Sequence, residues 1–525
     1  MKETILSAER FTVTAAIDYV NGDPHLGHAY EKIGCDVLAR HHRLRGADVR
    51  LILGSDEHSQ SVERAARAEG VDTEAYCARQ AAVFESAFAR LDIVPTAFVR
   101  TSGDANRRST ERMLTLLHDR GHVYRGSYAA WYCPSCEQFY TEKELHDGAC
   151  PVHERPVEWV EEENWFFRLS AFADALEHHL EQHPDALTPE SRRNEILNVI
   201  RGGLEDISIS RGFSTWGFPL PFDRGQVAYV WFDALLAYVT GVGFAADDAE
   251  FERFWPADLH VIGKDITRFH AVMWPAMLLA AGLPLPRRVH AHGFVTYRGL
   301  KMSKTSGVRI DPMALVDRYG SDAVRHVLMA EVPFDRDGDF TLESFVDRYN
   351  ADLANDYGNL VSRTEKMVSR YRDGRLPAPV APDALDGELR DAALQVTRDT
   401  IAAADAVAPN EMVAAARGLV ARANRYIDER KPWVLAREGE DARLDTTLHH
   451  LVEAVRVATL LLHPVIPRAT RVVADDLGVS LDGDSMAAAG RFDVLVPGAT
   501  VGVGPILFPR LDRAAELAAA ENAGA

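Results

Sequence analysis

The first hundred residues alternate between apolar runs and a helical pattern, in the order expected of a β-α-β unit. RFTVTAAIDYV carries β-branched and aromatic residues and predicts a strand, which the turn residues NGDP end. Helical periodicity then begins with Pro24 at the first helical position, and Gly46 ends it. The apolar run DVRLILG predicts a second strand, buried on both faces. A right-handed crossover makes the two strands parallel, so PHLGH and GSDEH should face one crevice.

The predicted helix starts with two histidines three residues apart, His25 and His28. Residues at this spacing share one helix face, and the first turn offers unpaired N–H groups and the positive end of the helix dipole. Gly27 leaves space for a ligand to approach closely. These features favour a phosphate site, while a solvated helix start or part of a zinc site are the alternatives that the pair alone leaves open.

A second candidate phosphate-binding segment lies near residue 300. YRGLKMSKTSG places Lys301 and Lys304 three residues apart, with glycines on either side. Two ammonium groups on a loop suit a polyphosphate whose charge shifts during a reaction. A solvated basic loop is the alternative for the lysines taken alone.

Beyond about residue 348 the pattern is helical. Asn355, Asn359 and Arg363 are spaced by four and so share one helix face, and Trp433 follows a proline. Amides read base edges, arginine binds phosphate or stacks, and an exposed indole is a platform for an unstacked base. Helix packing is the alternative for each residue by itself.

Three of the five cysteines fall in a metal-binding pattern, C-x2-C-x13-C-x2-H. This spacing predicts a tetrahedral structural zinc site with no open position, made of Cys133, Cys136, Cys150 and His153. A disulfide is the alternative, and it does not suit a reducing compartment. We expect Cys35 and Cys77 to be buried or inert.

Chain length and net charge limit the classes of protein to which this sequence can belong. A chain of 525 residues should form two to four domains. The net charge of −20 argues against a protein that coats nucleic acid by bulk charge, but not against a local basic contact surface. Neither a signal peptide nor an apolar run of membrane-spanning length is evident, so we expect a cytoplasmic protein without a membrane anchor.

The two phosphate-binding candidates together carry a family resemblance. HLGH and KMSKT resemble the two signatures of class I aminoacyl-tRNA synthetases. VWFDALLAY, GKDITRFHAVMWPAMLLAAGLPLP and HGFVTYRGLKMSKTSG resemble methionyl-tRNA synthetases in particular, and the resemblance runs from about residue 10 to about residue 470.

The resemblance implies an α/β fold. A Rossmann-like catalytic domain would carry an inserted zinc-knuckle connective domain and be followed by an all-α anticodon-binding bundle. The expected segments are 1–118 and 227–285 for the two catalytic halves, 119–226 for the connective domain, 286–348 for the KMSKS-containing stem-contact region and 349–525 for the bundle. We expect a monomer, because no appended oligonucleotide-binding domain of the dimerising kind follows.

The resemblance also implies two reactions in one crevice. Methionine and ATP, with Mg²⁺, would form methionyl-adenylate and pyrophosphate, and the acyl group would pass to the terminal adenosine of initiator and elongator tRNA(Met). The implied catalytic residues are His25, His28, Lys301 and Lys304, and the implied ATP contacts are these four with Gly27, Met302 and Ser303. The implied methionine pocket is Ala16, Ile17, Tyr19, Asp56, Trp231, Tyr238, Asp265 and His270. The anticodon contacts would be Asn355, Asn359, Arg363 and Trp433, and the zinc knuckle would be structural.

Two residues beside the implied pocket depart from the family pattern. Asp18 stands where relatives mostly have an uncharged residue, and Ser59 stands where glycine is common. Asp18 either faces the pocket or points away, as alternate strand residues do. Two other functions stay open at this point: a paralog that activates an amino acid for a different acceptor, and a zinc-containing RNA-binding protein without catalysis.

Overall fold

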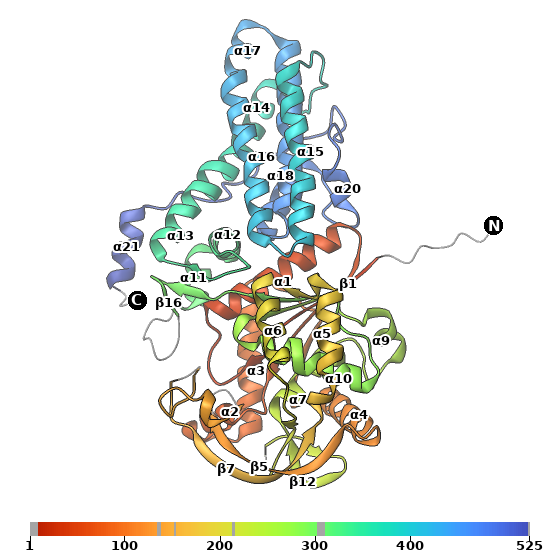
Figure 1. The fold of residues 1–525 in the computed structure, drawn as a ribbon. Coiled ribbons are helices and arrows are strands. Elements are labelled where there is room, and N and C mark those ends of the chain that lie inside the picture. Colours follow the sequence, from red (N-terminus) through yellow and green to blue (C-terminus); the bar gives the residue numbers. More distant parts are fainter. Residues whose placement is uncertain (1–8, 134–137, 152–153, 213–215, 302–309, 523–525) are drawn as a thin grey trace, which may run out of the picture.

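The centre of the molecule is a parallel sheet of seven strands. The computed structural model describes residues 9–133, 138–151, 154–212, 216–301 and 310–522. The sheet order is β2-β3-β1-β13-β14-β8, with β4 also paired to β3 (Figure 1). Its strands are β1 Arg10–Ala15, β2 Asp18–Tyr19, β3 Asp48–Asp56, β4 Ala97–Arg100, β8 Leu187–Thr188, β13 Leu259–Gly263 and β14 Val289–His292. The predicted parallel β-α-β unit is confirmed, since β1 and β3 pair in parallel.

The single strand predicted over RFTVTAAIDYV is wrong in one respect, because it is broken by a bulge. From Thr14 to Asp18 the chain advances four residues, while their partners on β3 advance three, from Ile52 to Ser55. One extra residue therefore lies at positions 16–17, where β1 ends and β2 begins. A one-residue slip reverses which side chains face each side of a sheet. The bulge thus decides where Asp18 points.

Helix α1, Leu26–Leu44, begins two residues later than the pattern predicts. Pro24 is not the first helical residue, because the His25 side chain caps the helix and sets its start. Gly46 follows the helix end with φ +83°, a conformation that glycine adopts without strain. Leu26, Tyr30, Ile33 and Val37, which recur at helical spacing, are all buried.

Helices cover the sheet, and an antiparallel sheet is inserted between its halves. The helices before the insertion are α2 Gln60–Glu69, α3 Thr73–Arg90 and α4 Asp104–Asp119. The inserted sheet has the order β6-β5-β7-β9, from β5 Val123–Cys133, β6 Gln138–Tyr140, β7 Glu158–Phe167 and β9 Ile207–Ser208. Helices α5 Ala173–Gln182 and α6 Glu190–Arg201 flank β8, which returns to the central sheet beside β14.

The chain next forms a small antiparallel sheet, several helices and a β-hairpin. A small sheet of β10 Ser210–Arg211, β11 Pro219–Leu220 and β12 Asp223–Ala228 leads into α7 Val230–Ala234, α8 Ala237–Thr240, α9 Asp248–Phe254 and α10 Trp274–Ala281. After β14, the strands β15 Val295–Tyr297 and β16 Leu300–Lys301 form an antiparallel hairpin, and β15 pairs in parallel with β17 Gly338–Asp339.

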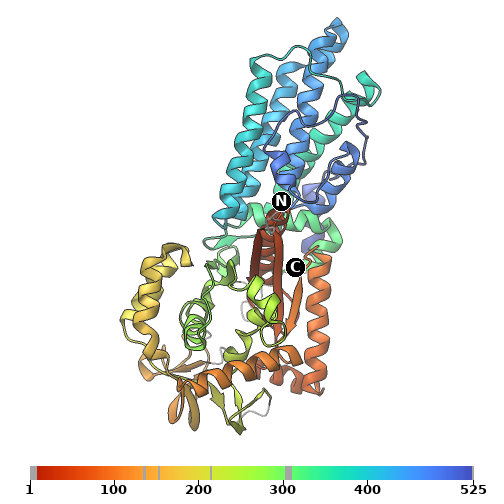
Figure 2. The same ribbon diagram turned by 90° about the vertical axis from the view of Figure 1, so that its right-hand side faces the viewer.

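The remaining elements are helical, and a bundle stands at the opposite end of the molecule from β5 and β7 (Figures 1 and 2). They are α11 Pro312–Tyr319, α12 Ser321–Glu331, α13 Leu342–Arg348, the π-helix Tyr349–Gly358, α14 Asn359–Arg372, α15 Ala384–Asp405, α16 Pro409–Arg430, α17 Pro432–Glu438, α18 Asp441–Leu462, α19 Pro467–Leu477, α20 Ser485–Ala489 and α21 Arg513–Asn522. No helix in the described ranges is both long and apolar enough to cross a bilayer.

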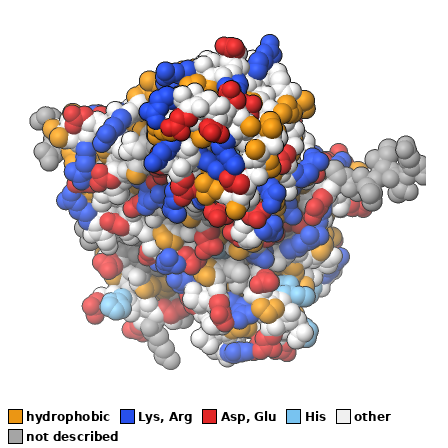
Figure 3. All heavy atoms as spheres, turned by 90° about the horizontal axis from the view of Figure 1, so that it is seen from above, with side chains coloured by type: hydrophobic (Ala, Val, Ile, Leu, Met, Phe, Trp, Pro, Cys, Tyr) orange, Lys and Arg blue, Asp and Glu red, His pale blue; other side chains and the backbone are white. Residues whose placement is uncertain are grey.

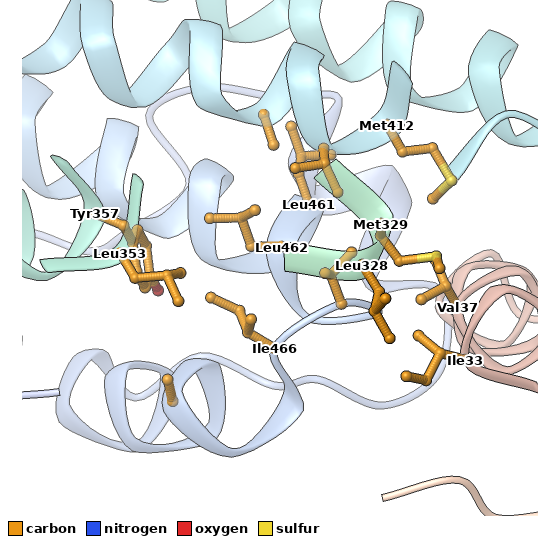
Figure 4. Close-up of a cluster of buried hydrophobic side chains, with 14 of the residues drawn as sticks. Ile33, Val37, Leu328, Met329, Leu353, Tyr357, Met412, Leu461, Leu462 and Ile466 are labelled. Carbon is orange, nitrogen blue, oxygen red and sulfur yellow. The ribbon is translucent and has the colours of Figure 1, made fainter. Parts of the chain in front are cut away.

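The bundle and α1 share one hydrophobic core. Figure 4 shows Ile33 and Val37 of α1 beside Leu328 and Met329 of α12, with Met412 of α16 close by. All five side chains belong to a single buried cluster that continues through the bundle. The helical region is therefore packed directly onto the helix that starts with the two histidines. The expected segment boundaries stay predictions.

Candidate active site

The first turn of α1 is held by its own two histidines. Nδ1 of His25 accepts a hydrogen bond from the backbone N–H of Gly27 at 3.1 Å, and Nδ1 of His28 accepts one from the backbone N–H of His25 at 3.0 Å. The two rings stack with their centroids 3.7 Å apart. A side chain on Gly27 would press on the His25 ring, since its Cβ would lie 3.0 Å from Cε1. Glycine thus lets the His25 ring keep its capping position without moving.

The cap determines which ring nitrogens can donate. A nitrogen that accepts a hydrogen bond carries no proton, so in both neutral rings the proton resides on Nε2. His25 is exposed and His28 is half-buried, so both rings border solvent at the helix start. The turn therefore presents two Nε2–H donors beside the positive end of a helix, an arrangement suited to binding phosphate.

The GSDEH segment, which spans the end of β3, lies beside the first turn of α1. Asn21 Nδ2 donates to Ser61 Oγ at 3.0 Å, which joins the loop before α1 to the start of α2. Asp56 is 2% exposed at the carboxyl end of β3, in register with Tyr19 of β2. PHLGH and GSDEH thus lie at one sheet edge, as expected. Ser59 has a local role, because its Oγ caps α2 by accepting from the N–H of Val62.

Aromatic rings line the same edge. The indole of Trp231 stacks on Phe269 with centroids 3.8 Å apart and planes within 4°, and it meets the Tyr19 ring edge-on at 6.2 Å. Phe269 opens a π-helix, Phe269–Met273, whose next residue is His270. Sequence reasoning did not single out Phe269, although it lies inside the GKDITRFHAVM stretch. A surface of this kind suits an unbranched apolar or thioether side chain.

His270 is a neutral hydrogen-bonding partner behind these rings. Its Nδ1 donates to the carbonyl oxygen of Ile266 at 3.0 Å, so Nε2 accepts from the hydroxyl of Tyr238 at 2.7 Å. Burial lowers the pKa of His270 to about 4, which keeps the ring uncharged at neutral pH. Burial, followed by the charges of Glu31 and Asp18, raises the pKa of Tyr238.

The remaining predicted pocket residues fall around the same edge, with one difference in exposure. Ala16 is buried and Ile17 is half-buried at the bulge, whereas Asp265 is exposed in the turn after β13. Asp18 does not face the pocket. It is buried and its Oδ1 accepts from Lys32 Nζ of α1 at 2.5 Å, with His28 Nε2 3.8 Å away. The open question about Asp18 is thus settled by the bulge.

The second phosphate-binding segment is described only at its start. Lys301 ends β16, in register with Thr296 of β15, and the hairpin follows directly from β14. The Lys301 side chain, Met302, Ser303 and Lys304 lie outside the described residues. The predicted contacts of this segment therefore stay predictions.

Two of the four predicted zinc ligands lie in the described ranges. Cys133, at the end of β5, and Cys150 are buried with Tyr140 in one small cluster, and Cys150 Sγ lies 3.7 Å from Tyr140 Oη. Cys133 and Cys150 are not joined to each other by a disulfide. Cys136 and His153 lie outside the described residues. The two cysteines supply two of the four donors that a tetrahedral zinc site requires, and the described residues contain no group of three or more possible metal ligands. Cys35 and Cys77 are buried, as expected.

The predicted anticodon contacts lie on the surface of the bundle. Asn355 and Asn359 are exposed, Arg363 pairs with Asp428 at 3.3 Å, and the Trp433 side chain is 46% exposed. Exposed Lys431 and Arg437 flank Trp433 in sequence. Figure 3, which looks at the bundle from its end, shows Lys and Arg side chains interspersed with acidic ones. Lys and Arg side chains are thus available for local contacts on this surface, although the net charge of the chain is negative.

Comparison with known proteins identifies the class that this fold defines. The family model for class I tRNA synthetases (M) matches residues 11–156 and 143–365, and the model for the anticodon binding domain of methionyl tRNA ligase matches residues 377–522. A solved structure of Mycobacterium tuberculosis methionyl-tRNA synthetase in complex with methionyl-adenylate aligns with TM-score 0.92 and 42% identity, over 96% of this chain and 100% of that one.

Curated relatives narrow the class to one family. The methionine–tRNA ligase of Caldanaerobacter subterraneus is 42% identical over 98% of this chain and 80% of its own length. That of Thermosynechococcus vestitus is 44% identical over 90% of both chains. The chain belongs to the methionine–tRNA ligase family.

Proposed function

We propose that the chain joins methionine to tRNA in two steps, with the first turn of α1 and the aromatic-lined sheet edge as its active site. One observation carries the assignment of the site: two Nε2–H donors fixed by a helix cap lie at the same edge as Asp56 and the Trp231–Phe269 stack. Donors for a phosphate and a surface for a thioether are what methionine activation by ATP needs.

The nucleotide is assigned to the α1 turn. His25 and His28 donate from Nε2 to the triphosphate, and Gly27 allows close approach. Lys301 and Lys304, with Met302 and Ser303, are proposed to close on the phosphates from the β15–β16 hairpin and to stabilise the charge that develops on the departing pyrophosphate. Mg²⁺ bound to ATP would offset further phosphate charge.

Methionine is assigned to the aromatic-lined edge. Asp56 is assigned to the substrate ammonium, because its buried carboxylate lies at the carboxyl end of β3, in register with Tyr19. Tyr19, Trp231 and Phe269 contact the thioether. Ala16, Ile17, Tyr238, Asp265 and His270 complete the proposed pocket, with the Tyr238–His270 hydrogen bond fixing the inner wall.

The two steps need no protein nucleophile. The methionine carboxylate oxygen attacks the α-phosphorus of ATP, the α–β phosphoanhydride bond breaks, and pyrophosphate leaves. A hydroxyl of the terminal adenosine of tRNA(Met) then attacks the acyl carbon, and AMP leaves. The residues act by positioning the reactants and stabilising phosphate charge.

The bundle is assigned to the anticodon of initiator and elongator tRNA(Met). Asn355 and Asn359 offer amides for base edges, Arg363 offers a guanidinium for phosphate or stacking, and Trp433 offers an exposed ring for an unstacked base. Zinc held by Cys133, Cys136, Cys150 and His153 would stabilise the inserted sheet and take no part in the reaction. We place the enzyme in the cytoplasm as a monomer.

Methionine-dependent exchange of pyrophosphate into ATP tests the first step, and charging of a CAU-anticodon transcript tests the second. We expect both activities, with Lys301→Ala/Lys304→Ala lowering exchange by about 100-fold or more. Exchange without charging would favour a paralog that serves another acceptor. Loss of exchange at saturating substrate, with RNA binding retained, would leave only a binding protein.

A further inference from the structure

Four ionisable side chains are buried directly beneath the first turn of α1. They come from three separated parts of the chain: Asp18 from β2, Glu31 and Lys32 from α1, and His292 from the end of β14. Each residue is at most 6% exposed. Groups of this kind are rarely buried unless they are paired, because removal from water disfavours the charged form.

The four groups form one connected network. Lys32 Nζ donates to Asp18 Oδ1 at 2.5 Å and to Glu31 Oε1 at 2.8 Å. The other Glu31 oxygen, Oε2, accepts from His292 Nε2 at 2.8 Å. The pKa of Lys32 rises because its two carboxylate neighbours outweigh burial. Burial opposes ionisation of Glu31, but Lys32 and His292 overcome it and lower the pKa of Glu31 to about 2.

His292 hydrogen-bonds on both sides of its ring. Its Nδ1 lies 2.7 Å from the carbonyl oxygen of Gly293, which can only accept, and its Nε2 faces the ionised Glu31. His292 therefore connects Glu31 to the backbone at Gly293. Burial raises the pKa of Asp18 to about 7, and the Lys32 ammonium beside it acts in the opposite direction, toward the charged form of the carboxylate.

The network touches the proposed nucleotide site through Asp18. Asp18 Oδ1 is 3.8 Å from His28 Nε2, the nitrogen that carries the ring proton. The second oxygen, Oδ2, is buried without a hydrogen-bond partner among the described residues. The carboxylate thus lies against the donor that the proposed function assigns to the ATP phosphates. Without a cation beside it, this carboxylate would repel them.

We propose that Lys32 is a positioning residue for adenylation: it neutralises Asp18 and Glu31 beneath the His25–His28 turn and so keeps their negative charge from opposing the ATP phosphates. The inference rests on the proposed function, because that function places the phosphates against His28. It explains how an acidic residue at position 18 is compatible with a phosphate site. Lys32 touches no substrate in this role and acts through the charge balance of the network.

Variants that change the charge beneath the His25–His28 turn in opposite directions distinguish the positioning role of Lys32 from a merely structural role. Lys32→Met removes the ammonium that is hydrogen-bonded to both Asp18 and Glu31. Asp18→Asn instead removes one carboxylate, and the double variant Asp18→Asn/Lys32→Met removes one group of each sign. A merely structural role would make both single variants worse and the double variant worst.

The test is pyrophosphate exchange with the full chain, with KM measured separately for ATP and for methionine. We expect Lys32→Met to raise the KM for ATP by roughly tenfold or more, since an uncompensated unit charge near a phosphate costs that much at a protein-like dielectric. Asp18→Asn should leave it unchanged or lower, and the double variant should return to within about threefold of the parent. The KM for methionine should change less in every variant.

Arg456→Met is the matched control, because Arg456 and Glu453 form an equally buried ion pair within α18, far along the chain from this turn. It should lower the melting temperature without raising the KM for ATP.

Two results would overturn the inference: an unchanged KM for ATP in folded Lys32→Met, or a double variant whose KM for ATP is no lower than that of Lys32→Met. In either case, pyrophosphate exchange by the parent chain would still support the proposed function. If Lys32→Met does not fold, a raised KM for ATP in Asp18→Asn would overturn it. Absence of exchange in the parent chain would overturn both.

Discussion

The guanidinium of Arg325 donates to the carboxylate of Asp36 at 2.7 Å, and both side chains are fully buried. Arg325 also donates to the carbonyl oxygens of Pro464 and Val465, in the turn that follows α18. Asp36 lies on α1, two turns beyond His28. Arg325, on α12, thus joins α1, the helix of the proposed active site, to the turn that follows α18 of the bundle.

Removal of Arg325 should destabilise the protein strongly. Arg325→Met leaves Asp36 as a buried charge with only Arg40 beside it, so we expect a loss of about 3–5 kcal/mol in the free energy of unfolding. Urea unfolding followed by circular dichroism measures this. The double variant Asp36→Asn/Arg325→Met removes the stranded charge and should recover part of the loss; an equally large or larger loss would contradict the assignment.

His28→Asn should separate the capping role of His28 from its role toward phosphate. An asparagine oxygen can accept the His25 N–H in place of Nδ1, but it offers no donor at the position of Nε2. We expect the rate of pyrophosphate exchange to fall by about 100-fold or more, with little change in melting temperature. His178→Asn, at an exposed position of α5, is the control. Unaltered exchange in His28→Asn would remove this residue from the site.

Tyr238→Phe should weaken the use of methionine more than that of ATP. The substitution leaves Nε2 of His270 buried without its donor, at a cost of about 1–3 kcal/mol. If the Tyr238–His270 pair forms the inner wall of the methionine pocket, the KM for methionine should rise about tenfold while the KM for ATP holds. Equal changes in both constants would indicate a general loss of structure instead.

Stability should fall as the pH drops below about 6.5. Burial lowers the pKa of both His270 and His290 to about 4 in the folded chain. Between pH 6.5 and 4 the unfolded chain therefore binds more protons at these sites, so stability is fully present above pH 6.5 and declines toward pH 4, by up to about 3 kcal/mol for each histidine. Urea midpoints across this range test the direction. His290→Gln should flatten the profile, and an unchanged slope would show that His290 does not contribute.

Trp433→Ala should impair tRNA charging and leave adenylation intact. The ring is 46% exposed, so its removal should cost little folding stability, whereas a lost stacking contact with a base costs about 1–3 kcal/mol. We expect the KM for tRNA to rise roughly 10- to 100-fold with pyrophosphate exchange unchanged. Trp159→Ala, a 55% exposed tryptophan on β7, is the matched control. Normal charging by Trp433→Ala would remove this residue from the anticodon surface.

The pattern of apolar residues was sufficient to predict the elements whose structure depends on residues close together in the sequence. The alternation and spacing of apolar residues predicted β1, α1 and β3 and their parallel pairing, and thereby placed His25, His28 and Asp56 at one sheet edge. The family motifs indicated the aromatic pocket residues that lie there. Gly46 ends α1 in the left-handed conformation that its residue type favours. These features depend on neighbours a few residues apart, or on the fixed handedness of a crossover.

The sequence by itself thus determined the fold class, the family and the position of the two histidines on one turn. Tertiary structure alone decided that a bulge turns Asp18 toward Lys32, that Glu31 meets His292 across 261 residues of chain, and that Phe269 stacks on Trp231. It also decided that the first turn of α1 is capped by imidazoles and not opened by Pro24. The reason is physical: periodicity shows which face of an element is apolar, but pairing register and long-range burial determine what each polar side chain on it meets.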